Sequence, residues 1–559
     1  MNGLIAHKPN AANHAASIRP SPLSSRFVWA MRLCIALWVI GAAAPWSYAQ
    51  SSTEDDHTLL AGFPFSPPVP AASAAPENTG EDPQDEGLGN FRHISITTPT
   101  TKRLSLVDVA PGLLPFFNNA PVFGLPGTVE GNFWHRTQLL GDLNGRRTDL
   151  ADRGIFIDMY STTAYQNVTS GGIKTGNAYA QNTQLSINVD TAKAGLWPGG
   201  LFHLTVQSRY GSTPQNSFTV GSFVPQYTGF VVPGPTLWQD TEPSEYLLTQ
   251  ALTKKVSTIL GVISDIFVPD QTLFGDSYKY YFANFNLNKN PMTTNTYHPT
   301  AIAALGAVTP NKWLAIVGGV LDPFTRANTL EDAFHQGVDV YLTAIASYTL
   351  GGLPGQISPE FNWSNGPHIF LKSPFFEPLS TSQVPQAVGA LLGNAPTAGL
   401  PVNFHNDTVF VLSSFSQYLH LKEEDPSDVA EKLKSGQPLR GIGVFNRLGY
   451  TPDTTGTLTR DASVALFARG LLDSRQYDSF GVGFYFNGVS PHFKNDIEQL
   501  TAGTRPKNEK GIEIFYDFAI TPAIRLNPSY QHVWNPLIAG VASRQNHADL
   551  FLARLNLAF

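Results

Sequence analysis

The sequence contains a single cysteine, Cys34, among 559 residues. Cys34 lies in an N-terminal stretch that we expect to be removed, so the mature chain would have neither a disulfide nor a thiolate metal site. Charged residues are also scarce, at 14% of the sequence. No stretch reaches the roughly 18 consecutive apolar residues that a membrane-spanning helix needs. These absences fit soluble β-rich proteins and also transmembrane β-barrels, because half of each barrel strand faces water.

The N-terminus has the pattern of an export signal. Arg26 and Arg32 precede the apolar run 33–44, and the Ser-Tyr-Ala sequence at 47–49 fits a cleavage site before Gln50. We therefore predict a signal peptide over 1–49, cleaved near Ala49–Gln50, with a retained membrane anchor as the alternative. Its removal takes away four basic residues and no acid, which lowers the net charge from −7 to −11. A chain this acidic is not expected to bind nucleic acid.

Residues 50–130 are rich in Pro, Ala, Ser and acidic residues, and they keep no period of two or 3.6. This composition predicts a flexible, disordered tether. The rest of the chain, 131–559, is the predicted folded domain.

The end of the sequence, 549–559, alternates in steps of two. Phe551, Ala553 and Leu555 share one face, whereas Arg554 and Asn556 share the other. An apolar face opposite a polar one suits a strand with lipid on one side and water on the other.

Similar segments recur through the domain, and their polar faces carry Asn, Gln, Ser and Thr more often than the Lys and Glu of a solvated surface. The sequence therefore predicts an all-β, transmembrane antiparallel β-barrel. Single-chain bacterial barrels have even strand numbers, so we predict 16 strands, with 18 as the alternative. Short helices are predicted over 144–153 and 424–435. The candidate strands lie near 155–166, 180–192, 200–211, 244–253, 255–265, 279–290, 299–307, 312–322, 337–350, 354–363, 406–420, 438–450, 461–471, 478–488, 511–521, 523–533 and 547–559, one more than the predicted number.

Three parts of the sequence resemble the carbohydrate-selective porins of the OprB family. They are LLGD at 139–142 with Gly145, Arg147 and Gly154; GLWPGG at 195–200; and the run of RGIGVFNR at 440–447, YFNG at 485–488, EIFY at 513–516 and LNPSYQ at 526–531. The family usually has Trp where this chain has Leu143. The resemblance spans 131–559 and implies a 16-stranded barrel in the bacterial outer membrane that lets sugars diffuse in. It implies no cofactor, and by analogy with porins it extends to a homotrimer surrounded by outer-membrane lipid.

A sugar-selective pore needs polar groups for hydroxyls, aromatic faces for the ring and a narrow constriction. Inward placement of a charge is favoured because a charge facing lipid at mid-bilayer costs about 2–4 kcal/mol. The alternation puts four arginines on inward faces, and three acids are their candidate counterparts. Two tryptophans beside or within long connections are candidate sugar platforms. For each arginine the alternative is a structural ion pair in the barrel wall. The candidate pore-lining residues are Arg209, Arg447, Arg469, Arg525, Glu360, Glu513, Asp517, Trp238 and Trp363.

A general or anion-preferring porin is the nearest alternative function. An outer-membrane barrel enzyme would need an activated nucleophile with a base. No G-x-S-x-G, H-E-x-x-H or P-loop string occurs in the sequence, so we do not expect an enzyme. An exported adhesin would carry polar rather than apolar outer faces.

Overall fold

The structure is a computed structural model that describes residues 131–211, 217–224, 226–227, 241–263, 279–292, 300–311, 313–322, 333–335, 337–371, 404–422, 425, 429, 439–501 and 503–559. The predicted signal peptide and tether lie outside the described residues. So does the helix predicted over 424–435, apart from residues 425 and 429.

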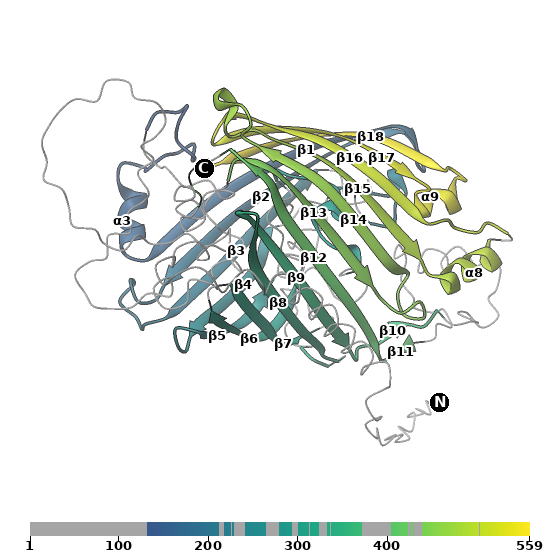
Figure 1. Ribbon diagram of the computed structural model, residues 1–559, viewed down its shortest axis with the longest axis horizontal. Coiled ribbons are helices and arrows are strands. Elements are labelled where there is room, and N and C mark those ends of the chain that lie inside the picture. The colour runs from purple at the N-terminus through teal and green to yellow at the C-terminus, as the bar shows by residue number, and fades with distance from the viewer. Residues whose placement is uncertain are drawn as a thin grey trace, which may run out of the picture. The chain divides into compact units, whose positions relative to one another are not determined.

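Sixteen antiparallel strands form a closed barrel, which confirms the predicted fold and strand number (Figure 1). Each strand pairs with its neighbours in chain order, and the first strand closes on the last. A separate pair, β10 (His368–Ile369) and β11 (Phe404–His405), lies within one connection. The barrel strands are β1 (Ile155–Gly171), β2 (Gly176–Asp190), β3 (Gly200–Gly211), β4 (Thr241–Ala251), β5 (Val256–Ile263), β6 (Ala301–Asn311), β7 (Leu314–Leu321), β8 (Asp339–Leu350), β9 (Leu353–Ser364), β12 (Thr408–Leu421), β13 (Gly441–Tyr450), β14 (Leu458–Arg469), β15 (Ser479–Val489), β16 (Glu509–Thr521), β17 (Ile524–Trp534) and β18 (His547–Ala558).

One of the seventeen candidate strands, the one over 279–290, is wrong. The described part of this segment pairs with no strand and contains the short helix α5 (Phe285–Asn288). Residues 285–288 alternate apolar and polar side chains as a strand would, but the Asn284 side chain accepts a hydrogen bond from the Asn286 N–H at 3.0 Å and starts a helical turn. The apolar and the polar side chains of 285–288 are all buried, so the alternation here does not distinguish a lipid-facing side from a water-facing side.

The two faces of the strands differ as the sequence predicts. In β18, Arg554 and Asn556 are buried on the inner face, whereas Phe551 is 54% exposed on the outer face. In β16, Glu513, Phe515 and Asp517 are buried inside, whereas Ile514 and Tyr516 between them form part of an exposed apolar band. The closed sheet leaves no edge strand, which is a requirement for β-structure in lipid.

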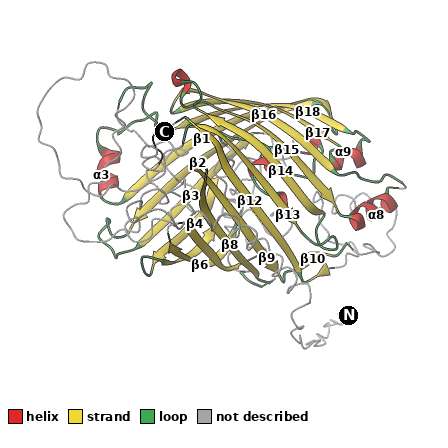
Figure 2. Cartoon of the chain, viewed as in Figure 1, coloured by secondary structure: helices red, strands yellow, loops and turns green. Residues whose placement is uncertain are grey.

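The helices are short and lie in the connections (Figure 2). The helix predicted over 144–153 is confirmed as α3 (Arg146–Asp152), immediately before β1. The others are α4 (Ser217–Val220), the 3-10 helix η7 (Asp473–Arg475), α8 (Pro491–Leu500) and α9 (Leu537–Ala542). Within the described ranges, none of the helices is long and apolar enough to cross a membrane.

The two ends of the barrel carry different connections. The end where β1 begins and β18 finishes, called the terminal end below, has short turns at 252–255, 351–352 and 522–523. The longer connections 212–240, 264–300 and 365–407 leave from the opposite end, called the loop end. One longer connection, 422–440, lies at the terminal end.

The segment before β1 fastens the seam between the first and last strands. The Leu139 N–H donates to the Ala558 carbonyl at 2.8 Å, and Arg147 Nη2 donates to the Phe559 backbone oxygen at 2.9 Å. Arg147 also donates to the Gln138 side chain, which donates to Asp158 at the start of β1 at 3.0 Å. The stretch 138–147 therefore links α3 to both sides of the seam.

We expect Arg147→Ala to weaken the closed barrel, because a hydrogen bond to a charged group contributes about 1.5–3 kcal/mol. The loss would be measured on a gel that separates the folded barrel from the unfolded chain. We expect a lower temperature, or a lower urea concentration, at which half of the protein is unfolded. Arg146→Ala is the matched control, because Arg146 is exposed on the same helix. Equal midpoints for the two variants would contradict the role assigned to Arg147.

Candidate functional site

A segment of the β5–β6 connection, residues 279–292, packs against the inner wall of the barrel. We call it the inner segment. Its residues are buried except for Tyr281, which is partly exposed. Most of its contacts are with the inner faces of β13 to β18, so it narrows the lumen along that side. Lys279 instead reaches β1 and β2, and Asn284 Nδ2 also donates to Gln226 of the β3–β4 connection at 2.6 Å.

Inward side chains of β17 and β18 bind consecutive carbonyls at the start of the inner segment. Asn556 Nδ2 donates to the Lys279 oxygen at 2.6 Å, and Asn527 Nδ2 donates to the Tyr280 oxygen at 2.8 Å. Arg554, which is fully buried, donates to the next carbonyl, that of Tyr281. The wall therefore recognises the backbone of this segment. The sequence analysis placed Arg554 on the polar face but did not include it in the site.

Glu513 and Arg447 hold the middle of the inner segment. The Glu513 carboxylate accepts hydrogen bonds from the Ala283 N–H at 2.9 Å and the Asn284 N–H at 2.8 Å. Arg447 Nη1 donates to the Leu287 carbonyl at 2.8 Å. The structure places both predicted side chains inside, as the alternation indicated. Both bind the backbone of the inner segment, and the Arg447 guanidinium also lies 4.7 Å from the centre of the Phe445 ring.

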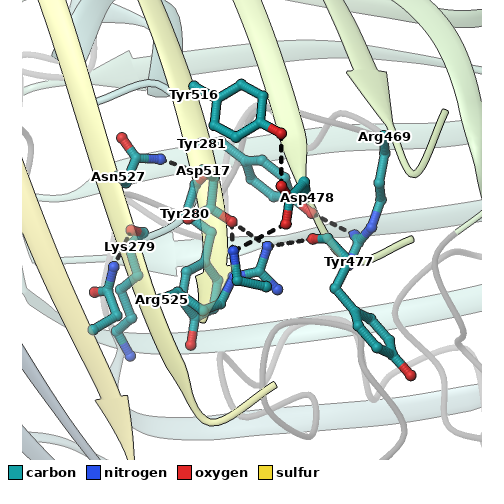
Figure 3. Close-up of polar contacts among 12 residues, drawn as sticks. Lys279, Tyr280, Tyr281, Arg469, Tyr477, Asp478, Tyr516, Asp517, Arg525 and Asn527 are labelled. Carbon is teal, nitrogen blue, oxygen red and sulfur yellow. Dashed lines mark hydrogen bonds and ion pairs between the residues drawn. The ribbon is translucent and has the colours of Figure 1, made fainter. Parts of the chain in front are cut away.

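Arg525 and Asp517 form a buried ion pair, with Arg525 Nε at 2.7 Å from Asp517 Oδ2 (Figure 3). The guanidinium also donates to the Tyr477 carbonyl at 2.6 Å and lies 4.7 Å from the centre of the Tyr280 ring. For this pair the structure matches the alternative reading, a structural ion pair in the wall. It anchors the inner segment through the ring of Tyr280.

Arg469 and Tyr281 form the part of the site best suited to a sugar. Arg469 Nη1 donates to the Tyr281 hydroxyl at 3.1 Å (Figure 3). The Tyr281 ring meets the Phe467 ring edge to face, with 5.0 Å between the ring centres. An aromatic face beside a forked donor can hold the apolar face and the hydroxyls of a sugar ring. Tyr281 was not among the predicted site residues, because its segment was predicted to be a strand. The aromatic run 280–282 was the available signal.

Lys279 reaches from the inner segment to the first two strands. Its Nζ donates to the Gln184 Oε1 at 2.9 Å and lies 4.2 Å from the centre of the Tyr160 ring. Burial lowers the pKa of Lys279 to about 7, against the opposing effect of the Asp158 and Glu245 carboxylates.

The remaining predicted residues lie apart from this cluster. Arg209 and Glu360 are buried on the inner faces of β3 and β9, as expected. Trp363 differs from the expectation: it alternates with the inward Asn362 and Ser364, so it faces outward, where its Nε1 donates to Asp407 at 3.1 Å. Its place beside a long connection did not reveal its face. Trp238 lies outside the described residues.

Metal chemistry has no candidate centre in the described part of the chain, where no three His, Cys, Asp or Glu side chains gather as ligands. His203, the histidine on the inner face of β3, is bound instead to Asn188 at 2.8 Å.

Comparison with known proteins gives a family and similar solved structures. The family described as "Carbohydrate-selective porin, OprB family" matches residues 174–552. The high-pH structure of OprB from Pseudomonas putida has a TM-score of 0.61 and 16% identity, covering 77% of this chain and 100% of that one. The low-pH structure of Pseudomonas putida OprB has a TM-score of 0.45 and 12% identity, covering 76% and 99%. No curated protein sequence matches significantly.

We expect Glu513→Gln to loosen the inner segment, because one amide oxygen would replace a carboxylate that serves two N–H donors. An unsatisfied buried N–H costs about 1–3 kcal/mol. Single-channel recordings should show a larger and noisier conductance. Glu498→Gln, on the exposed side of α8, is the control. Identical conductance in both variants would mean that Glu513 does not hold the segment.

Proposed function

The chain belongs to the OprB family of carbohydrate-selective porins, and from this membership we propose that it is a passive channel for mono- or small oligosaccharides in which the inner segment forms the constriction. The fold supports the proposal because a closed barrel with a polar inner face can carry polar solutes across lipid. The inner segment supports it because it occupies one side of that lumen.

The observation that carries the proposal is the Tyr281–Arg469 pair. Tyr281 is the partly exposed side chain of an otherwise buried segment, and its hydroxyl is bound by a guanidinium. A ring face and a forked donor offer weak, oriented contacts to a sugar, and a channel needs contacts that also release. We assign the direct sugar contact to these two residues.

Arg447 and Glu513 then act indirectly, by holding the inner segment in place. Each binds the backbone of the inner segment and so fixes how far Tyr281 projects into the lumen. They are positioning residues, and their effect on flux would come from the geometry of the segment. Arg525, paired with Asp517, has the same role closer to the terminal end.

The same proposal includes the export of the chain and the orientation of the barrel in the membrane. We infer a signal peptide over 1–49 and a tether over 50–130 before the barrel domain of 131–559. Bacterial barrels have short periplasmic turns and long outer loops, so the terminal end would face the periplasm and the loop end the exterior. A homotrimer stays a prediction by analogy with porins.

A general or anion-preferring porin is the second candidate, favoured by the four buried arginines of β13, β14, β17 and β18. Three of these arginines already have partners within the chain. Asp517 pairs with Arg525, and backbone carbonyls accept hydrogen bonds from Arg447 and Arg554.

The deciding experiment is solute flux into liposomes that carry the refolded chain. Glucose, a disaccharide, a neutral amino acid of similar size and a small anion would be compared. We expect glucose to enter faster than the size-matched amino acid. Entry ordered by size alone would indicate a general pore, and preferred entry of the anion would indicate the second candidate.

Tyr281→Ala should reduce the preference for sugar over the amino acid by up to about tenfold, because aromatic contacts contribute about 0.5–1.5 kcal/mol. Tyr281→Phe keeps the ring and should lose less. Tyr165→Ala, on the exposed outer face of β1, is the control. An unchanged preference in a folded Tyr281→Ala channel would remove this residue from the site.

A further inference from the structure

A second polar cluster lies on the outside of the barrel, at the loop end. On the outer face Lys510 of β16 pairs across to Trp534 of β17, which pairs to His547 of β18. The next row toward the terminal end contains His532 and Asp549.

The next row of outward-facing side chains toward the terminal end is apolar and aromatic. It holds Ile514, Tyr530 and Phe551, and Ile514 and Phe551 are 40% and 54% exposed. Lys510 also pairs with Phe486 of β15, the neighbour on its other side. The polar rows therefore begin where the exposed apolar band stops. In a membrane barrel this boundary lies at the level of the lipid head groups.

Asp549 organises the cluster. Its carboxylate accepts hydrogen bonds from the Tyr530 hydroxyl at 2.6 Å, from His532 Nδ1 at 2.6 Å and from the Ser170 hydroxyl at 2.7 Å. The pairing of β1 with β18 shifts between Val168 and Ser170, and such a bulge turns a side chain to the other face. With three donors on it, this carboxylate is already satisfied by its own neighbours.

Exposed cations of β14, β16 and the adjoining connections at the loop end are not matched in this way. Arg460 of β14 pairs across to Gly488 of β15, on the side of Lys510 away from Asp549. Arg460, Lys507, Lys510 and Arg544 are all exposed, and none of them forms an ion pair within the described residues. By contrast, the nearby Arg505 pairs with Glu498. The Lys510 Nζ lies 5.5 Å from the centre of the Trp534 ring, over the aromatic edge of the band.

We propose that this surface, formed by Arg460, Lys510, His532, Trp534 and His547 and called the rim patch, binds the phosphate of a membrane lipid head group. Unmatched cations attract an anion, and a phosphate accepts several donors at once. The apolar band directly below offers Phe551 and Ile514 to the acyl chains, which a soluble anion would not use. The proposal is independent of sugar selectivity, because the patch faces away from the lumen.

The phosphate could come from a phosphorylated glycolipid or from a glycerophospholipid, and the test separates them. Binding to the full chain in neutral detergent would be measured by native mass spectrometry. The probes are diphosphoryl lipid A, the same glycolipid without phosphates, phosphatidylglycerol and inorganic phosphate. We expect the phosphorylated lipids to bind more tightly than the dephosphorylated glycolipid and than inorganic phosphate. The tighter of the two lipids identifies the source.

The double variant Arg460→Gln with Lys510→Gln should weaken lipid binding about fivefold for each cation removed. Both side chains are exposed, so the barrel should stay folded, which heat modification on a gel would verify. Lys254→Gln, an exposed lysine in the turn at the terminal end, is the matched control and should bind as the parent does. Equal binding by the double variant and the control, or equal binding of the dephosphorylated glycolipid, would overturn the proposal.

Discussion

Closure of β1 on β18 is the constraint on which the rest of this structure depends. Backbone groups in lipid have no water to pair with, so a sheet is stable there only when its last ladder is made. Here that ladder is reinforced from outside the sheet by Leu139 and Arg147, which bind the backbone of residues 558 and 559. Once the barrel is closed, the two-residue period of each strand assigns every side chain to lipid or to the lumen.

Placement in the lumen leaves several charges buried, and such charges need partners. A buried pair of opposite charges is one solution, used by Arg525 and Asp517. Arg447, Arg554 and Glu513 use a different one, because they bind carbonyls and N–H groups of the inner segment. That exchange satisfies the wall and the segment together, since backbone groups that belong to no strand also need hydrogen-bond partners. The position of the inner segment is therefore a consequence of how the wall charges are satisfied.

On the outer face of the barrel, too, the surrounding solvent decides where polar side chains lie. Its middle is apolar, and polar groups gather where the band ends, as at Asp549 and Lys510. Inside, charges are matched by the chain itself. At the rim, four exposed cations are not matched within the described residues, which is why lipid phosphate is the natural complement there.

The sequence by itself determined the class of fold and the face on which Arg447, Arg469, Arg525, Glu513 and Asp517 lie, because a period of two specifies orientation at each residue. It left the strand number open, since its seventeen candidate strands allow 16 or 18 under the even-number rule, and the closed barrel decided for 16. It also determined α3, through a local helical pattern ended by Gly154 at φ 79°. Only the tertiary structure decided what these side chains touch. Residues 279–290 alternate like a strand, and nothing local to them reveals that β13 to β18 bind their backbone. Trp363 was misplaced for a different reason: it was chosen for its position beside a long connection, although its alternation with Glu360 and Asn362 puts its ring on the outer face. Contacts between residues hundreds of positions apart, such as Ala283 with Glu513, depend on barrel closure, and closure is a property of the whole chain.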